Sequence, residues 1–169
     1  MTNNDVLRRI RYVFDYDDAQ MVAIFALADL EVKRGHIIAW LQKEEHPAYE
    51  ECKDRMLATF LNGLIIEKRG KRDGPQPTPE SSLTNNLILT KLKIALSLQS
   101  DDIIEIVKLA GFHLSASELG SFSRKPGHRN YRECKDQVLR NFLKGLQLKL
   151  RDKPAEKPRP KWPTRPPNS

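Results

Sequence analysis

Basic and amide side chains are concentrated between residues 124 and 144 of this 169-residue chain, with only two acidic residues among them. Arginine, lysine, asparagine and glutamine are the donors that meet phosphate oxygens and the edges of nucleotide bases. Four of them recur at i, i+3, i+4 and i+7, which would place them on one helix face. The stretch predicts a binding surface for an anionic partner, formed by Arg124, Lys125, Arg129, Arg132, Gln137, Arg140, Asn141 and Lys144.

A polar helix face that contacts only solvent would show the same pattern. The distribution of charge along the chain helps to decide between a solvated face and a binding surface. The net charge is +7, and residues 85–151 carry 12 basic and six acidic side chains, whereas residues 1–69 carry ten basic and 12 acidic ones. This asymmetry favours an anionic partner for the second half of the chain. Solubility alone is the alternative explanation.

Histidines and cysteines offer the other candidate chemistry. His46 precedes Cys52 by six residues, and His128 precedes Cys134 by the same spacing. Structural zinc sites use shorter Cys-x-x-Cys or His-x₃-His pairs, so no metal or other cofactor is expected. A cysteine at a helix start can be an activated nucleophile, but no oxyanion-stabilising motif or phosphate-binding glycine loop accompanies these two. The sequence therefore predicts buried, reduced cysteines and no enzymatic activity.

An internal duplication determines which elements position these residues. A shift of 82 residues aligns positions 3–69 with 85–151 without a gap and gives 19 identities. The best-matching part runs from Tyr49 to Leu64 and corresponds to Tyr131 to Leu146. Self-similarity at one fixed spacing indicates a repeated supersecondary unit.

Each unit is expected to contain about four helices. Apolar residues recur at helical spacing in residues 54–69, and shorter amphipathic patterns precede them. In the second unit, Ser115 and Glu118 have the spacing of a capping box and predict the start of its third helix. Gly63 and Gly145 fall inside predicted helices, which indicates close helix packing. No alternating strand pattern is present, so the expected fold class is all-α.

The chain is expected to divide into four parts: a first helical unit at 1–69, a linker at 70–84, a second helical unit at 85–151 and a disordered, basic, proline-rich tail at 152–169. The two units are expected to pack together, because a unit of about 70 residues buries too little surface alone. The N-terminus lacks a signal-peptide pattern and no apolar run approaches the roughly 18 residues of a membrane helix. These features and the two cysteines favour a cytoplasmic protein.

Family resemblance is carried by four segments: Asn3–Arg8, Phe60–Gly70, Lys91–Leu98 and Asn130–Leu146. They resemble the YehS-like family of uncharacterised bacterial proteins. The resemblance covers residues 1–151 and leaves the proline-rich tail outside it. It implies a bacterial, cytoplasmic origin and transfers no catalytic residue, cofactor or partner.

Two functions are compatible with these features. The first is non-catalytic association with nucleic acid, RNA or DNA, through the basic second unit and the tail, whose Trp162 stands among basic residues. Residues 103–124 also look loosely like a helix-turn-helix, as any helical hairpin would. The alternative is a protein–protein adaptor or regulator whose groove between the units holds a partner helix.

Overall fold

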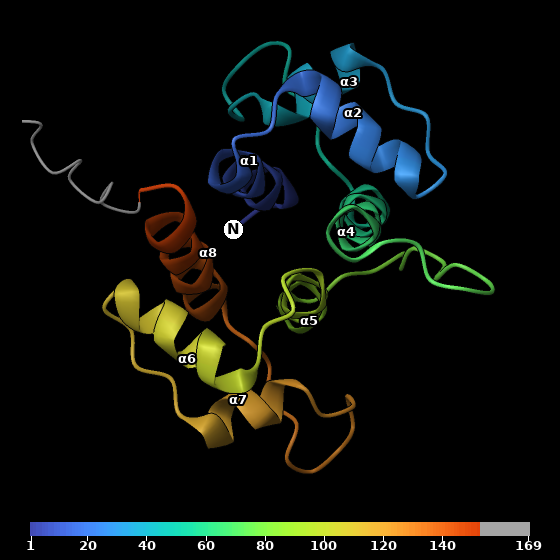
Figure 1. Cartoon of the computed structure of the whole chain (residues 1–169). Coiled ribbons are helices and arrows are strands. Elements are labelled where there is room, and N and C mark those ends of the chain that lie inside the picture. The colour runs from blue at the N-terminus through green and yellow to red at the C-terminus, as the bar shows by residue number, and fades with distance from the viewer. Residues whose placement is uncertain (153–169) are drawn as a thin grey trace, which may run out of the picture.

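The computed structural model describes residues 1–152, which contain eight α-helices and no strand (Figure 1). The first unit comprises α1 (Asn3–Phe14), α2 (Asp18–Leu27), α3 (Arg34–Leu41) and α4 (Asp54–Arg69). The second comprises α5 (Asn85–Ala95), α6 (Ser100–Leu109), α7 (Ala116–Phe122) and α8 (Asp136–Leu150). The predicted all-α class with two tandem four-helix units is confirmed. None of these helices is long and apolar enough to cross a membrane.

The predicted tail at 152–169 lies outside the described residues, apart from Asp152. The predicted linker at 70–84 contains no helix. At the start of α7, the Ser115 hydroxyl accepts the backbone N–H of Glu118 at 3.1 Å, and the Glu118 carboxylate accepts the backbone N–H of Ser115 at 3.4 Å. The expected capping box is therefore present, and it determines where this short helix begins.

Four helices, α1, α4, α5 and α8, form the centre of the molecule (Figure 1). Across the two units, α4 packs against α5 and α1 packs against α8. These two junctions are equivalent under the repeat alignment, because α1 corresponds to α5 and α4 to α8. The pair α2 and α3 lies on one side of the four central helices, and α6 and α7 lie on the other. The duplication thus builds one apolar core to which both units contribute.

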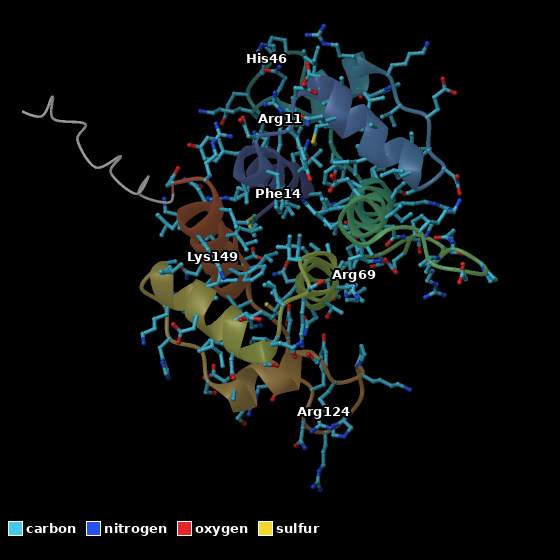
Figure 2. All side chains as sticks on the ribbon, viewed as in Figure 1. Arg11, Phe14, His46, Arg69, Arg124 and Lys149 are labelled. Carbon is cyan, nitrogen blue, oxygen red and sulfur yellow. The ribbon has the colours of Figure 1, made fainter. Side chains whose placement is uncertain are left out.

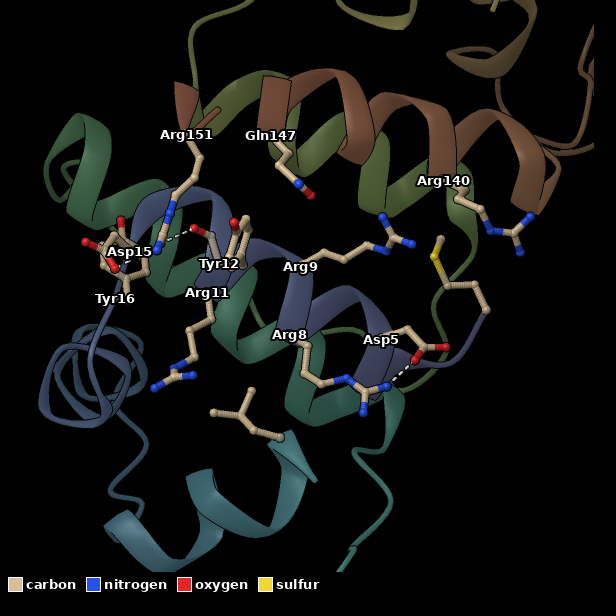
Figure 3. Close-up of a pocket in the computed structure, with 12 residues that line it drawn as sticks. Asp5, Arg8, Arg9, Arg11, Tyr12, Asp15, Tyr16, Arg140, Gln147 and Arg151 are labelled. Atoms are coloured by element: carbon tan, nitrogen blue, oxygen red, sulfur yellow. Dashed lines mark hydrogen bonds and ion pairs between the residues drawn. The ribbon is translucent and has the colours of Figure 1, made fainter. Parts of the chain in front are cut away.

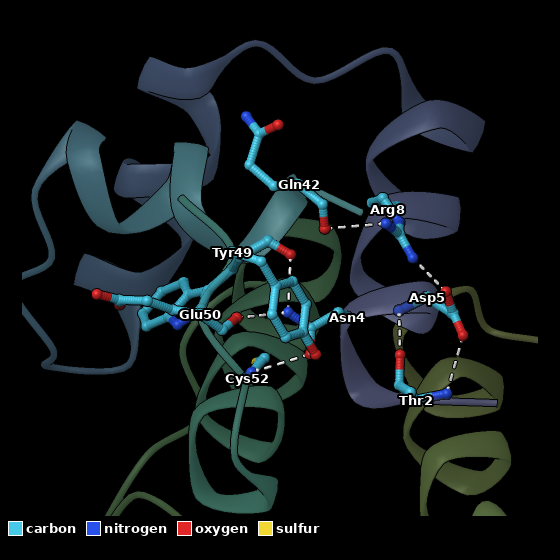
Figure 4. Close-up of polar contacts among 9 residues, drawn as sticks. Thr2, Asn4, Asp5, Arg8, Gln42, Tyr49, Glu50 and Cys52 are labelled. Carbon is cyan, nitrogen blue, oxygen red and sulfur yellow. Dashed lines mark hydrogen bonds and ion pairs between the residues drawn. The ribbon is translucent and has the colours of Figure 1, made fainter. Parts of the chain in front are cut away.

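The repeated Asn-Asn pair ties the first helix of each unit to the loop before its last helix. The buried Asn4 amide donates to the carbonyl oxygens of Trp40 at 2.9 Å and Glu50 at 2.8 Å, and its oxygen accepts the Cys52 N–H at 2.9 Å (Figure 4). Asn86 makes the equivalent bonds to Phe122, Arg132 and Cys134. Because a buried amide needs partners, these bonds account for its presence in both copies.

Both cysteines are free and buried beside these loops, as predicted. Burial, together with the neighbouring carboxylates of Asp54 and Asp136, raises the pKa of both thiols to about 12. His46 and His128 are exposed instead, and each imidazole Nδ1 accepts a backbone N–H two residues later in the chain. Within residues 1–152, no cluster of three or more histidine, cysteine, aspartate or glutamate side chains has the arrangement of a metal site.

Gly63 on α4 and Gly145 on α8 allow close helix packing in their units. A Cβ atom at Gly63 would overlap the carbonyl group of Ile24 in α2, whose carbon would lie 2.9 Å away. A Cβ atom at Gly145 would overlap the carbonyl group of Ile106 in α6, whose carbon would lie 2.7 Å away. Backbone atoms cannot move aside as a flexible side chain can. The two glycines therefore recur because of helix packing, as the sequence predicted.

Replacing either glycine by alanine should destabilise the protein. We expect Gly63→Ala and Gly145→Ala each to lower the free energy of unfolding by roughly 1–3 kcal/mol, because overpacking outweighs the better helix propensity of alanine. The control is Gly35→Ala in α3, where an added Cβ would meet nothing within 4 Å. This variant should gain up to about 1 kcal/mol. Urea unfolding followed by circular dichroism measures all three, and equal effects would contradict the packing argument.

The cysteines should resist thiol reagents in the folded protein. The thiolate is the reactive form, and burial disfavours it at both positions. We expect Cys52 and Cys134 to react slowly with Ellman's reagent at neutral pH and rapidly after unfolding in guanidinium chloride. Fast labelling of both thiols in the native protein would contradict their burial.

Candidate anion-binding groove

Helices α1 and α8 lie side by side and run in the same direction, because contacts hold both their starts and their ends together (Figure 3). At the start, the amino group of Met1 donates to Asp136 Oδ2 at 2.8 Å. At the end, Arg151 donates to the carbonyl oxygen of Tyr12 at 2.8 Å and to Asp15 Oδ1 at 2.9 Å. The bond from the amino group, with another from the Asn85 amide, holds the pKa of Asp136 below its usual value.

The junction between α4 and α5 has the corresponding contacts. The backbone N–H of Leu83 donates to Asp54 Oδ2 at 2.9 Å, and Arg69 donates to the carbonyl oxygen of Ile94 at 3.3 Å. Under the repeat alignment these are the Met1 and Arg151 contacts of the other junction. Side chains that differ between the two junctions are consequently not required by the shared packing.

A cavity of about 760 Å³ opens beside α1, bounded by α8 and by the end of α3 (Figure 3). Two aspartates, Asp5 and Asp15, line it, but the cations outnumber them. We name this cavity the arginine groove after its five arginines, which are Arg8, Arg9, Arg11, Arg140 and Arg151. The groove therefore carries an excess of positive charge.

Two of these arginines connect α1 to its own unit. Arg8 donates to the carbonyl oxygen of Gln42 at 3.0 Å, just past α3, and pairs with Asp5. Burial alone would raise the pKa of Asp5, but hydrogen bonds from Thr2 and Arg8 hold it below its usual value, so the carboxylate remains charged. Arg11 lies 3.6 Å from Asp18 at the start of α2. These contacts, like those of Arg151, already have a structural role.

Arg9 and Arg140 differ from the other three. Neither forms a hydrogen bond or ion pair with any residue of the described range 1–152. Figure 3 shows Arg9 extending between α1 and α8, and Arg140 is exposed on α8. Arg140, Lys144, Gln147 and Arg151 follow i, i+4, i+7 and i+11 spacing, so they form one stripe along α8. This stripe faces the groove, since three of its four members line the cavity.

The equivalent positions of the other junction are electrically balanced. Lys91 and Asn62 correspond to Arg9 and Lys144 under the repeat alignment. The buried Lys91 ammonium donates to Asn62 Oδ1 at 2.6 Å and pairs with Glu80 at 2.9 Å. At the α1–α8 junction, Lys144 stands in the position of Asn62, so a second cation replaces the amide. A half-buried guanidinium without a paired counter-charge costs free energy, so contacts among the described residues do not account for Arg9.

Other groove residues also differ from their counterparts, which are uncharged at the α4–α5 junction. Thr90, Ile94 and Ala58 occupy the positions that correspond to Arg8, Tyr12 and Arg140. The α4–α5 junction thus lacks both the exposed tyrosine and most of the arginines. One copy of a duplicated junction has become a cationic groove, whereas the other has not.

The structure divides the binding surface predicted from the sequence. Arg140 and Lys144 belong to the α8 stripe. On the neighbouring face of α8, the half-buried Asn141 amide donates to the carbonyl oxygen of Gln137 at 2.9 Å. The remaining predicted residues lie in the loop after α7, at the opposite end of the molecule from Arg11 (Figure 2).

That loop borders a second hollow of about 620 Å³ beside α7. Arg124, Arg129 and Arg132 line it, and Lys125 is exposed nearby. The face of α7 in this hollow carries only alanine, serine and glycine, which are too short to reach far into a DNA groove. The helix pair α6–α7 also has a counterpart in α2–α3. A helix-turn-helix is therefore not needed to explain it.

Sequence reasoning missed the α1 side of the groove, namely Arg8, Arg9, Arg11 and Tyr12. The first unit has a small excess of acidic residues, which concealed the local run of arginines. A position-by-position comparison of the two copies would have detected this run, because Thr90 and Ile94 stand in α5 at the positions of Arg8 and Tyr12. Only the fold, however, places Arg9 and Arg140 in one cavity.

Comparisons with known proteins agree with the duplicated fold. Uncharacterized protein YehS of Escherichia coli (strain K12) is 44% identical over 147 residues, which covers 86% of this chain and 94% of that protein. No solved structure matches the chain significantly. The family described as "Protein of unknown function (DUF1456)" matches residues 3–70 and again residues 85–152. The chain therefore belongs to the DUF1456 family, which its two helical units match separately, and its resemblance to YehS-like proteins is confirmed.

Proposed function

We propose that this protein binds nucleic acid without catalysing a reaction, and that the arginine groove is its principal contact surface. The observation that carries the proposal is that Arg9 and Arg140 line one cavity and that neither forms a hydrogen bond or ion pair within the described residues. At the other junction the same packing holds a cation, Lys91, that is paired with Glu80. The packing therefore does not require unpaired cations, which supports a functional reason for those in the groove.

A phosphate group suits these arginines. The guanidinium is planar and always charged, and it pairs with phosphate through two parallel hydrogen bonds. The stripe from Arg140 to Arg151 is about 16 Å long at 1.5 Å per residue. Such a length exceeds one phosphate group and spans more than one nucleotide of a strand. A polymer of phosphates therefore fits the stripe better than a single anion.

The loop after α7 supplies a second basic surface in this proposal. Its cations, Arg124, Lys125, Arg129 and Arg132, surround a separate hollow and could extend the path of a bound chain. The sequence-based prediction that the tail also contributes concerns residues outside the described range. It stays a prediction.

The alternative function, an adaptor that holds a partner helix, has less support. Such a helix docks its apolar face in an apolar groove. The cavity at the α1–α8 junction is lined by arginines, and the more apolar hollow beside α4 and the linker measures only about 300 Å³. These lining residues favour nucleic acid as the partner.

Removing the two unpaired cations should weaken binding. We expect the double variant Arg9→Gln plus Arg140→Gln to bind mixed-sequence RNA and DNA oligonucleotides less tightly, and its salt dependence to fall by up to about two phosphate equivalents. The variant should be at least as stable to heat as the wild type, because neither side chain forms a hydrogen bond or ion pair within residues 1–152 and the half-buried Arg9 charge is removed. A salt titration of fluorescence anisotropy measures both the affinity and the slope.

The matched control is Lys71→Gln plus Lys108→Gln, which removes the same charge from exposed positions outside the groove. This variant should retain the wild-type salt slope. If the wild-type protein binds no oligonucleotide at low salt, the proposed function is wrong. If both double variants lose affinity equally, the groove is not the specific contact surface.

A further inference from the structure

We infer that the arginine groove accepts a single strand of nucleic acid, with a base stacked on the pair formed by Tyr12 and Arg151. The inference rests on the proposed function and names the class of nucleic acid. It follows from three properties of the groove: its concave shape, its aromatic side chain and the position of its unpaired cations.

The shape favours unpaired nucleotides. Proteins that read B-form DNA insert a protruding helix or strand pair into a major groove about 12 Å wide. The arginine groove is instead a hollow of about 760 Å³ between two helices. Cavities of roughly 300–1,000 Å³ enclose small ligands or parts of larger ones. A flexible strand can enter such a hollow, whereas an intact duplex can only touch its rim.

Tyr12 provides a platform for a base. It is 45% exposed although it belongs to a central helix. The guanidinium carbon of Arg151 lies 4.2 Å from the ring centroid. Bonds to the Tyr12 carbonyl oxygen and to Asp15 hold Arg151 in that position. Aromatic rings and arginine planes are the surfaces on which unpaired bases stack, whatever their sequence.

The platform and the cations lie at different points of the same groove. Arg151 is at the end of α8, and Arg140 is three turns earlier on the same stripe. Arg9 precedes Tyr12 by one turn on α1 and extends toward α8 (Figure 3). A strand that follows the groove would therefore place phosphates at Arg9 and Arg140 and a base at Tyr12. The other junction has Ile94 in place of Tyr12, so the shared fold does not require an aromatic ring here.

The test compares single-stranded and duplex oligonucleotides of the same sequence, each about 12 nucleotides or pairs long, by fluorescence anisotropy at fixed salt. We expect the full-length wild-type protein to bind the single strand about tenfold or more tightly than the duplex. Tyr12→Ala should weaken single-strand binding by about 5- to 150-fold, the range found when one stacked base loses its platform. Tyr12→Phe should retain most of the affinity, because the ring remains.

The matched control is Ile94→Ala at the corresponding position of α5, which is 42% exposed. It should leave single-strand binding unchanged. Equal binding of duplex and single strand, or unchanged binding by a folded Tyr12→Ala variant, would overturn this inference and leave the proposed function standing. Absence of binding to either oligonucleotide would overturn both.

Discussion

The carboxylates of Asp54 and Asp136 connect the three helices that meet at each junction. Asp54 accepts the Asn3 amide of α1 at 2.7 Å through one oxygen, and the Leu83 N–H just before α5 at 2.9 Å through the other. Asp136 makes the equivalent bonds, to Asn85 and to the Met1 amino group. Each carboxylate lies in the first turn of its own helix, where negative charge is favourable. The parallel packing that shapes the arginine groove depends on these bonds.

Because of the duplication, the α1–α8 junction can be compared with the equivalent α4–α5 junction of the same molecule. The two junctions share their end contacts, and the two units share their glycine packing and their asparagine bonds, so these features belong to the fold. What differs between the junctions is the charge along α1 and α8. At one junction, Glu80 and Asn62 satisfy the buried Lys91. At the other, Arg9 lacks such partners within residues 1–152. An uncompensated charge reduces stability, which is why binding is its more reasonable explanation.

The groove combines arginines that are bonded to the protein with arginines whose donors are free within residues 1–152. Arg8, Arg11 and Arg151 are held by carbonyl oxygens or carboxylates, and they stiffen the walls. The donors of Arg9 and Arg140 form no hydrogen bond within residues 1–152. Preformed walls reduce the ordering that binding requires, and the remaining donors supply the electrostatic attraction. This division of roles within one cluster agrees with a binding protein better than with a solvated surface.

The sequence by itself determined the all-α class, the two units and their local devices, because these depend on spacing along the chain. Helical periodicity, the capping box at Ser115 and the recurrence of Gly63 as Gly145 are all short-range or repeated signals. The groove was decided only by tertiary structure. Arg9 and Arg140 are far apart in sequence, and no periodicity relates them. Their proximity follows from the parallel packing of α1 on α8, which depends on long-range hydrogen bonds and on a core that both units share.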